Sequence, residues 1–427
     1  MTTKTTKITI TKSTVKVVNA RDEKEFPRAT KKDGRYITPW ETSKAQPGGW
    51  DNFKYAFVPN NSRVPAEEKL NEEPLMQIMN ADPNRIENPP ENGIRVTWLG
   101  HASVLYQLDN VNILTNPNFS TRGIRYYHPG GDFRYRKPVY DVQQLPRIDA
   151  VLISNTHFDH LDLPSIRSLN ERFGEMLLWY VPAGLQPWMS KAGCANVVEL
   201  EWWREDEVDF IDQSKVDDEE ETKVTKVKFV FCPSQNFHSR STDDDNAVLW
   251  GSWAVLTPRY KLFFVGTSGY CDVFKSIGRK YGPFHMAALP IGGYEPDYKF
   301  GFGACTPEEA VKIHQDLLAM CSLAITWGTF NFANEYYLEP PQRLQEELRK
   351  NGLSDMQFFL LKHGESRLIE IKEADDKQDE DEQAEEHHHH HEHHADEDQQ
   401  QTEEDQGLID YLVDKITGEE EKAEDDQ

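Results

Sequence analysis

The middle of the chain alternates short apolar runs with polar clusters, a pattern typical of buried strands joined by loops. The run Ala150–Ile153 is short and rich in Val, Leu and Ile, so it predicts a strand buried on both faces. The polar stretch Ser154–Asp162 follows at once and holds two histidines and two aspartates. Open α/β sheets carry ligands at the carboxyl ends of their strands. We therefore expect this loop to be the functional centre.

The same pattern predicts further elements on both sides of this loop. The predicted strands are Ile94–Leu99, Val104–Leu108, Val111–Thr115, Leu178–Val181, Lys226–Phe231, Trp250–Leu256, Lys261–Val265 and Leu323–Thr326. Asp109 and Asn110 predict a tight turn between two of them. The predicted helices are Leu163–Phe173, Pro307–Met320 with Thr306 as N-cap, and Arg343–Asn351. Strand-rich halves, each closed by helices, predict an α/β protein.

Charge separates the carboxyl-terminal end from the rest. The formal net charge is −26 over 427 residues, yet Glu373–Gln427 holds 24 Asp and Glu against 3 Lys, a net of −21 that leaves −5 elsewhere. This segment also has few apolar residues, and burying so little apolar surface cannot offset the entropy lost on ordering the chain. We therefore predict that residues 372–427 form a disordered acidic tail. Seven of the 15 histidines lie there, at His387–His391, His393 and His394. Within the tail, residues 408–416 have apolar side chains at helical spacing, which favours either a partner-docking helix or chance clustering.

The amino-terminal end is also set apart. Residues 1–34 predict a disordered basic arm, and 35–93 predict a polar, Pro-rich extension packed on the main domain. Five aromatic residues interrupt this extension: Trp40, Trp50, Phe53, Tyr55 and Phe57. They could meet a membrane interface or simply pack on the core.

Cysteine usage and hydropathy bear on the compartment. Five cysteines are widely spaced without a CxxC pair, which is typical of reduced thiols in a cytoplasmic protein. No apolar stretch reaches the length of a membrane-spanning helix. We expect a cytoplasmic protein that can associate peripherally with membranes.

Several stretches of the sequence resemble one known family. The central loop resembles the H-x-H-x-D-H signature of the metallo-β-lactamase superfamily, with Asn155 in place of the first histidine. Four other stretches resemble the N-acyl-phosphatidylethanolamine-hydrolysing phospholipases D of animals: Arg95–Ala102, Leu249–Trp253, Phe284–Gly292 and Leu361–Arg367. The resemblance runs in order from about Arg35 to Arg367. It implies a metallo-β-lactamase αββα sandwich over residues 35–371.

The resemblance also implies a two-metal site of five histidines and two aspartates. Three of these ligands are present: His157, Asp159 and His160. Four positions are substituted, namely Asn155, Asn236, Thr267 and Thr326; Ala304 stands where the family has a histidine near the substrate phosphate, and Asn116 where it has an aspartate. Neutral amides and hydroxyls are poor zinc ligands. We therefore expect no cofactor, or at most one weakly bound zinc.

Three functions follow as hypotheses. The first is a catalytically inactive relative, a pseudoenzyme, that retains a lipid- or protein-binding role. The alternative is a zinc-dependent phosphodiesterase that releases N-acylethanolamine and phosphatidic acid, using one metal on the three remaining ligands and perhaps His238. A third is metal storage by the His-rich tail. The expected partners are a phospholipid or membrane surface, a protein bound through residues 408–416, and a second copy in a homodimer; no nucleic acid is expected.

Overall fold

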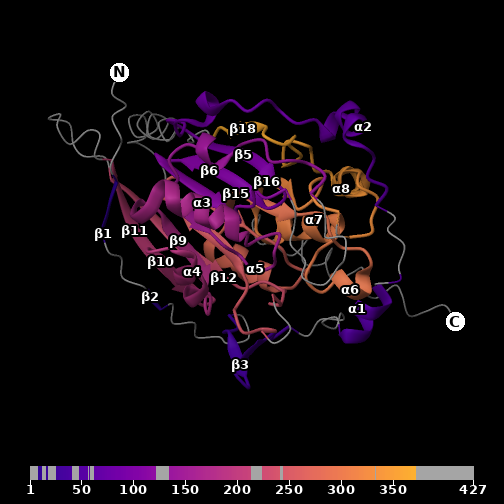
Figure 1. Ribbon diagram of the computed structural model, residues 1–427, viewed down its shortest axis with the longest axis horizontal. Coiled ribbons are helices and arrows are strands. Elements are labelled where there is room, and N and C mark those ends of the chain that lie inside the picture. The colour runs from indigo at the N-terminus through magenta and orange to yellow at the C-terminus, as the bar shows by residue number, and fades with distance from the viewer. Residues whose placement is uncertain are drawn as a thin grey trace, which may run out of the picture. The chain divides into compact units, whose positions relative to one another are not determined.

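Two mixed β-sheets face each other in the computed structural model of the chain, and helices cover their outer faces (Figure 1). The structure describes residues 8–11, 16–17, 26–40, 48–55, 57, 62–121, 134–212, 224–240, 244–331 and 333–371. Residues 1–371 and 372–427 form separate units. The expected acidic tail and the docking helix at 408–416 therefore lie outside the described residues.

The first sheet carries the central loop. Its order is β10 (Val197–Leu200), β9 (Leu178–Pro182), β8 (Ala150–Leu152), β7 (Val111–Thr115), β6 (Ser103–Leu108), β5 (Ile94–Gly100) and β18 (Ser366–Ile369). The strands from β7 to β10 are parallel, whereas β18, β5, β6 and β7 pair antiparallel. Every residue of β6, β7, β8 and β9 is buried, which explains the continuous apolar sequences of β8 and β9. Asp109 and Asn110 both have positive φ, as a two-residue hairpin turn requires.

The second sheet has the order β1 (Ile8–Thr11), β11 (Arg204–Asp212), β12 (Val224–Cys232), β13 (Ser252–Leu256), β14 (Lys261–Phe264), β15 (Phe284–Pro290), β16 (Ala319–Ile325) and β17 (Phe358–Phe359). A further short strand, β2 (Lys16–Val17), also pairs with β11. The strands from β14 to β17 are parallel. The carboxyl ends of β14 and β16, like that of β8, lead into the loops of the candidate site.

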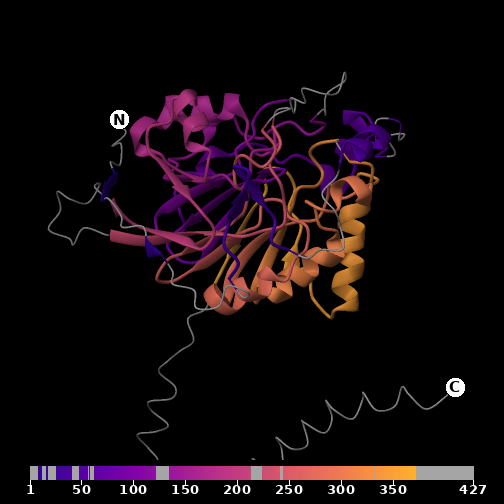
Figure 2. The same ribbon diagram turned by 90° about the horizontal axis from the view of Figure 1, so that it is seen from below.

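The helices are α1 (Gly49–Tyr55), α2 (Glu67–Glu72), α3 (Leu163–Phe173), α4 (Gln186–Ala192), α5 (Val273–Tyr281), α6 (Asp297–Phe300), α7 (Pro307–Asp316) and α8 (Glu339–Lys350). In Figure 2 the magenta helices α3 and α4 lie on one side of the sheets, and the orange helices α5, α7 and α8 lie on the other. The αββα sandwich predicted from the sequence is therefore confirmed. Asp162 caps α3 by accepting from Ser165 N at 3.1 Å, and Thr306 forms a capping box with Glu309 at the start of α7.

Several predicted bounds were wrong, and each has a local reason. The helix expected to run to Met320 ends at Asp316, because Leu318 has a φ of 54° and β16 begins one residue later. Helix α8 begins at Glu339, where two prolines in its first turn suit a helix start. Strand β13 begins at Ser252, because Trp250 and Gly251 belong to the preceding loop, and β15 was not expected as a strand.

The amino-terminal boundary also differs from the prediction. The hairpin of β3 (Thr30–Lys32) and β4 (Arg35–Ile37) crosses the expected boundary at residue 34. The described parts of the expected disordered arm include β1 and β2, since the alternating Ile8–Thr11 stretch can extend the sheet edge at β11. In the extension, Tyr36, Leu70, Met76 and Ile86 are buried. All five cysteines are free and buried, and no helix in the described part of the chain is long and apolar enough to cross a membrane.

Candidate functional site

The candidate site lies where four loops meet at the carboxyl ends of strands from both sheets. The loop after β8 provides Asn155, His157, Asp159 and His160, and the loops after β12, β14 and β16 bring Asn236, Thr267 and Thr326. Asn155, His160, Asn236 and Thr326 are all buried. Positions that are far apart in the sequence thus converge.

Buried tryptophans hold these loops in place through their indole N–H groups. Trp253 Nε1 donates to Ile153 O at 2.8 Å, just before the central loop. Trp250 Nε1 donates to Ser234 O at 3.1 Å, and Trp98 Nε1 donates to His101 O at 2.9 Å. A buried indole N–H needs such a partner. Each hydrogen bond therefore fixes the main chain beside the site and also pairs an indole N–H that would otherwise be buried without an acceptor.

Thr267 stands at the centre of a hydrogen-bond network. Its Oγ1 lies 3.0 Å from Asn155 Nδ2 and 2.9 Å from His160 Nε2. Its main-chain oxygen accepts from Asn236 Nδ2 at 3.0 Å. Thr267 therefore bonds directly to the two other substituted positions, Asn155 and Asn236, and to His160.

A second group joins two histidines to one carboxylate. Asp159 Oδ2 lies 2.7 Å from His101 Nε2 and 3.1 Å from His160 Nε2. Together these three residues make up the group of potential metal ligands among the described residues, with their ligand atoms within 4.8 Å of one another. Sequence reasoning missed His101, because it lies 58 residues from Asp159 in the turn between β5 and β6. The only feature of the sequence that pointed to His101 was its position in the Arg95–Ala102 stretch, which resembles the family.

His157 lies outside this group, and the expectation that His157, Asp159 and His160 form the remaining metal ligands stays a prediction. Its Nε2 faces Asn236 Oδ1 at 3.4 Å, and its ring packs edge-on against Phe237 at 5.0 Å between centroids. The imidazole is therefore turned toward the β12 loop instead of toward Asp159.

Burial controls the protonation of the site. It lowers the pKa of His101, and it lowers the pKa of His157 to about 4, so both rings are neutral near pH 7. Burial alone would raise the pKa of Asp159, but the adjacent His160 and His101 imidazoles hold it well below its usual range. The centre is therefore a carboxylate that accepts hydrogen bonds from imidazoles.

The other predicted positions lie at the edge of the site. The side chain of Thr326 turns back on its own strand, since its Oγ1 donates to Ile325 O at 2.8 Å. Ala304 precedes α7 beside Gly303, and a Cβ built on Gly303 would meet Asn236 Oδ1 at 2.8 Å. His238 is turned away, because its Nδ1 bonds to Thr156 Oγ1 and its Nε2 faces Asp244 at 3.4 Å.

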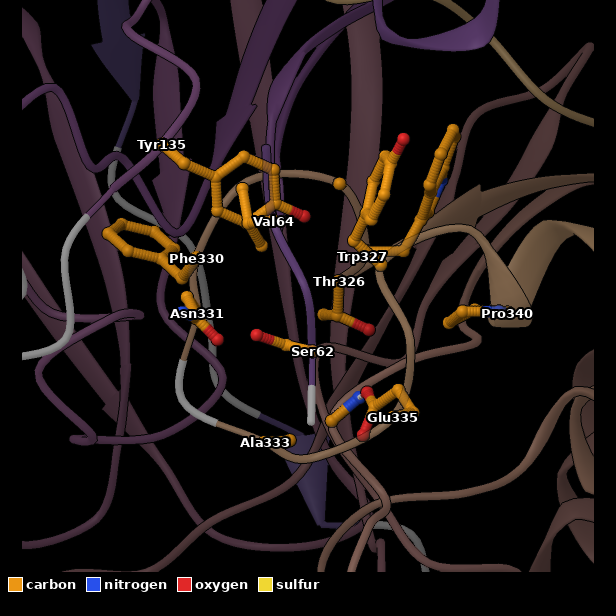
Figure 3. Close-up of a pocket in the computed structure, with 13 residues that line it drawn as sticks. Ser62, Val64, Tyr135, Thr326, Trp327, Phe330, Asn331, Ala333, Glu335 and Pro340 are labelled. Atoms are coloured by element: carbon orange, nitrogen blue, oxygen red, sulfur yellow. Dashed lines mark hydrogen bonds between the residues drawn. The ribbon is translucent and has the colours of Figure 1, made fainter. Parts of the chain in front are cut away.

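A small cavity opens behind Thr326 (Figure 3). Tyr135, Trp327, Phe330 and Glu335 line it together with Thr326, and its volume is about 30 Å³. Ligand pockets for drug-sized molecules measure roughly 300–1,000 Å³. This cavity is large enough for a water molecule or a small ion and too small to enclose a phospholipid.

Comparison with known proteins identifies the family. A family profile described as "Beta-lactamase superfamily domain" matches residues 111–326. The N-acyl-phosphatidylethanolamine-hydrolyzing phospholipase D 1 of Caenorhabditis elegans is 36% identical over 296 residues, which is 67% of this chain and 78% of that protein. The chain belongs to this phospholipase D family of the metallo-β-lactamase superfamily.

One further relative and one solved structure are similar to this chain. The mitochondrial N-acyl-phosphatidylethanolamine-hydrolyzing phospholipase D of Saccharomyces cerevisiae is 32% identical over 267 residues, 61% of this chain and 53% of that protein. The solved structure of Igni18, a metallo hydrolase from Ignicoccus hospitalis, has 17% identity and a TM-score of 0.45, and covers 65% of this chain and 99% of that one.

The family implies a metal centre, but the residues of this chain do not fit two zinc ions. Two ligands of one tetrahedral zinc at 2.0–2.1 Å stand about 3.3 Å apart. His101 and Asp159, at 2.7 Å, are instead a hydrogen-bonded pair. In the described part of the chain, the His101, Asp159 and His160 group could hold one ion at most. The assignment of the substituted ligand positions stays a prediction.

Proposed function

We propose that this chain is a non-hydrolytic member of its family that binds phospholipid peripherally at a membrane surface without zinc. The observation that carries the proposal is the position of Thr267, whose hydroxyl bonds to both Asn155 and His160. Neutral groups that bond to one another leave no open coordination shell. Activation of water by a two-metal site needs two dications held about 3.5–4 Å apart, and the charge needed to hold them is missing.

Support for membrane binding comes from an aromatic face on and just after α1, made of Trp50, Phe53 and Phe57. These side chains are 75%, 57% and 73% exposed. Adjacent rings touch edge-on, with centroid distances of 5.7 Å and 5.0 Å. By contrast, Trp40 packs on Trp202 and donates to Ser234 O. Trp40 therefore packs on the core, whereas the exposed aromatic face supports the proposal of membrane contact.

The aromatic face is connected to the candidate site. Helix α1 lies beside α6 (Figure 1), where Tyr55 packs edge-on against Phe300 at 5.3 Å. The chain then runs from α6 through Phe302, whose ring lies 6.3 Å from that of Phe237 beside Asn236. Large clustered aromatics at a membrane boundary bind lipid through buried apolar area. The α6 loop would place a lipid headgroup near the former metal positions.

The proposed lack of zinc-dependent hydrolysis is tested with the full chain. Its seven tail histidines are replaced by glutamine, so that the tail binds no metal of its own. We expect well under one zinc per chain by elemental analysis after purification without chelator. We also expect no N-acylethanolamine release from N-acyl-phosphatidylethanolamine vesicles by mass spectrometry. Two equivalents of zinc, or zinc-dependent release, would establish the alternative, a phosphodiesterase with a degenerate site.

Membrane binding is tested by co-sedimentation with phosphatidylcholine vesicles, with and without N-acyl-phosphatidylethanolamine. Replacing Trp50, Phe53 and Phe57 together by serine should weaken binding by about tenfold or more, because their apolar area no longer enters the interface. The matched control replaces Met320 and Met356, which are 56% and 68% exposed, by serine. Equal losses in both variants, or none in either, would remove the aromatic face from the proposal.

A further inference from the structure

Asn116, at the end of β7, has a side chain whose orientation is set by the main chain. The Ser154 N–H donates to its Oδ1 at 2.9 Å, and a main-chain N–H can only donate. The carboxamide nitrogen must therefore point the other way. It lies 2.8 Å from Ser154 Oγ and 2.7 Å from His160 Nδ1, and Asn116 is fully buried.

This orientation determines which nitrogen of His160 carries the proton. A carboxamide NH₂ is only a donor, so Nδ1 must accept, and a neutral imidazole then holds its proton on Nε2. The Nε2–H in turn faces Asp159 Oδ2 at 3.1 Å and Thr267 Oγ1 at 2.9 Å. Every ring nitrogen of His160 thus has a partner of the right polarity.

A metal ligand needs the opposite arrangement. A histidine bound to metal through one nitrogen donates the N–H of the other to a carboxylate or carbonyl, which fixes the tautomer and makes the ligand more basic. Here the group behind the ring is a donor, and the nitrogen that faces the site carries a hydrogen. Asn116 opposes metal binding even though it would not touch the ion.

We infer that Asn116 is a positioning residue that locks His160 in the Nε2–H tautomer and so keeps the site free of metal independently of the four substituted ligand positions. This inference rests on the proposed function. It adds a consequence for the chain with four restored ligands, Asn155→His, Asn236→His, Thr267→Asp and Thr326→His. In that chain His160 would still bind zinc poorly, so a fifth substitution, Asn116→Asp, would be required for tight zinc binding.

The tautomer is measured directly on the full-length chain labelled with ¹⁵N-histidine, by long-range ¹H–¹⁵N correlation at pH 8. The His160 signal is assigned by its loss in His160→Gln. We expect the Nε2–H pattern in the natural chain and the Nδ1–H pattern in Asn116→Asp, whose carboxylate accepts from the ring. Asn118→Asp is the charge-matched control, because Asn118 Nδ2 donates to Asp159 O at 3.0 Å and not to a ring. An Nδ1–H tautomer in the natural chain overturns the inference without any variant.

The effect on metal is measured by zinc competition with a chromophoric chelator, in the four-substitution chain with and without Asn116→Asp and with the tail histidines replaced by glutamine. Loss of such a partner typically costs 10–100-fold in metal affinity, so Asn116→Asp should tighten zinc binding by about that factor. Equal affinities would refute the inference while leaving the proposed function intact. Zinc in the natural chain would refute the proposed function itself.

Discussion

Thr267 shows how one residue can stabilise the site without a cation. Its hydroxyl connects the amide of Asn155 to the ring of His160, which also contacts Asp159. Buried polar groups that are all paired cost little, whereas an added charge without a partner is expensive. The site is therefore stable as a network of neutral groups around one carboxylate.

We predict that Thr267→Asp alone lowers the free energy of unfolding by about 1–2 kcal/mol at pH 7 relative to Thr267→Asn, because it places a second carboxylate near Asp159. Asparagine is the matched control, since it has the same size and no charge. The measurement is urea unfolding of both variants. The difference should shrink at acid pH as the new carboxyl group takes up a proton. Equal stability of the two variants at pH 7 would show that a second carboxylate near Asp159 carries no cost.

Among the elements, local sequence signals predicted most strands near the site, but not the partners of their side chains. The Asp109–Asn110 turn, the cap at Thr306 and the apolar run of β8 act within a few residues, so each can be recognised without a structure. The family resemblance indicated the converging loops. The pairing of His101 with Asp159 and the orientation of Asn116 depend on contacts across the fold. No local pattern encodes such contacts.

Helix α7 provides a prediction about pH. His314 on α7 is buried, its Nδ1 lies 2.8 Å from Ser322 Oγ on β16, and burial lowers its pKa to about 4 from 6.5. The unfolded chain therefore binds more protons than the folded one between these pH values. The stabilisation is complete above about pH 6.5 and declines as the pH falls toward 4, by about 3 kcal/mol.

The matched variant is His314→Gln, which can bond to Ser322 but does not titrate. Urea unfolding of both chains between pH 7.5 and pH 4 should show the natural chain losing more stability than the variant. If the two profiles run parallel, His314 is not neutral in the folded state.

At the scale of the whole molecule, Asp109 ties the two sheets together at the end opposite the candidate site. It lies in the β6–β7 turn of the first sheet and accepts from Thr257 Oγ1 and Arg259 Nε, both at 2.6 Å, in the β13–β14 turn of the second. Its main-chain oxygen also accepts from Thr225 on β12 at 2.8 Å.

We predict that Asp109→Ala costs about 2 kcal/mol of unfolding free energy, because a buried acceptor of a charged hydrogen bond is lost and its φ of 47° disfavours alanine. Asp109→Asn should cost about half as much, since asparagine tolerates this backbone conformation and still accepts a hydrogen bond. Urea unfolding compares the two variants. A variant as stable as the natural chain, or more stable, would show that the buried carboxylate is a net burden.

The paired network around Thr267 also bears on how such a chain can change by descent. For the non-hydrolytic chain proposed above, each single change toward a metal ligand at Asn155, Asn236 or Thr267 would break one of these hydrogen bonds without completing a metal site, so it would lower stability before it could restore hydrolysis. Reversion would therefore pass through several intermediate sequences that are less stable than this chain and still inactive. Single mutations can still change the aromatic face and other exposed surfaces, whereas single substitutions in the buried centre are disfavoured.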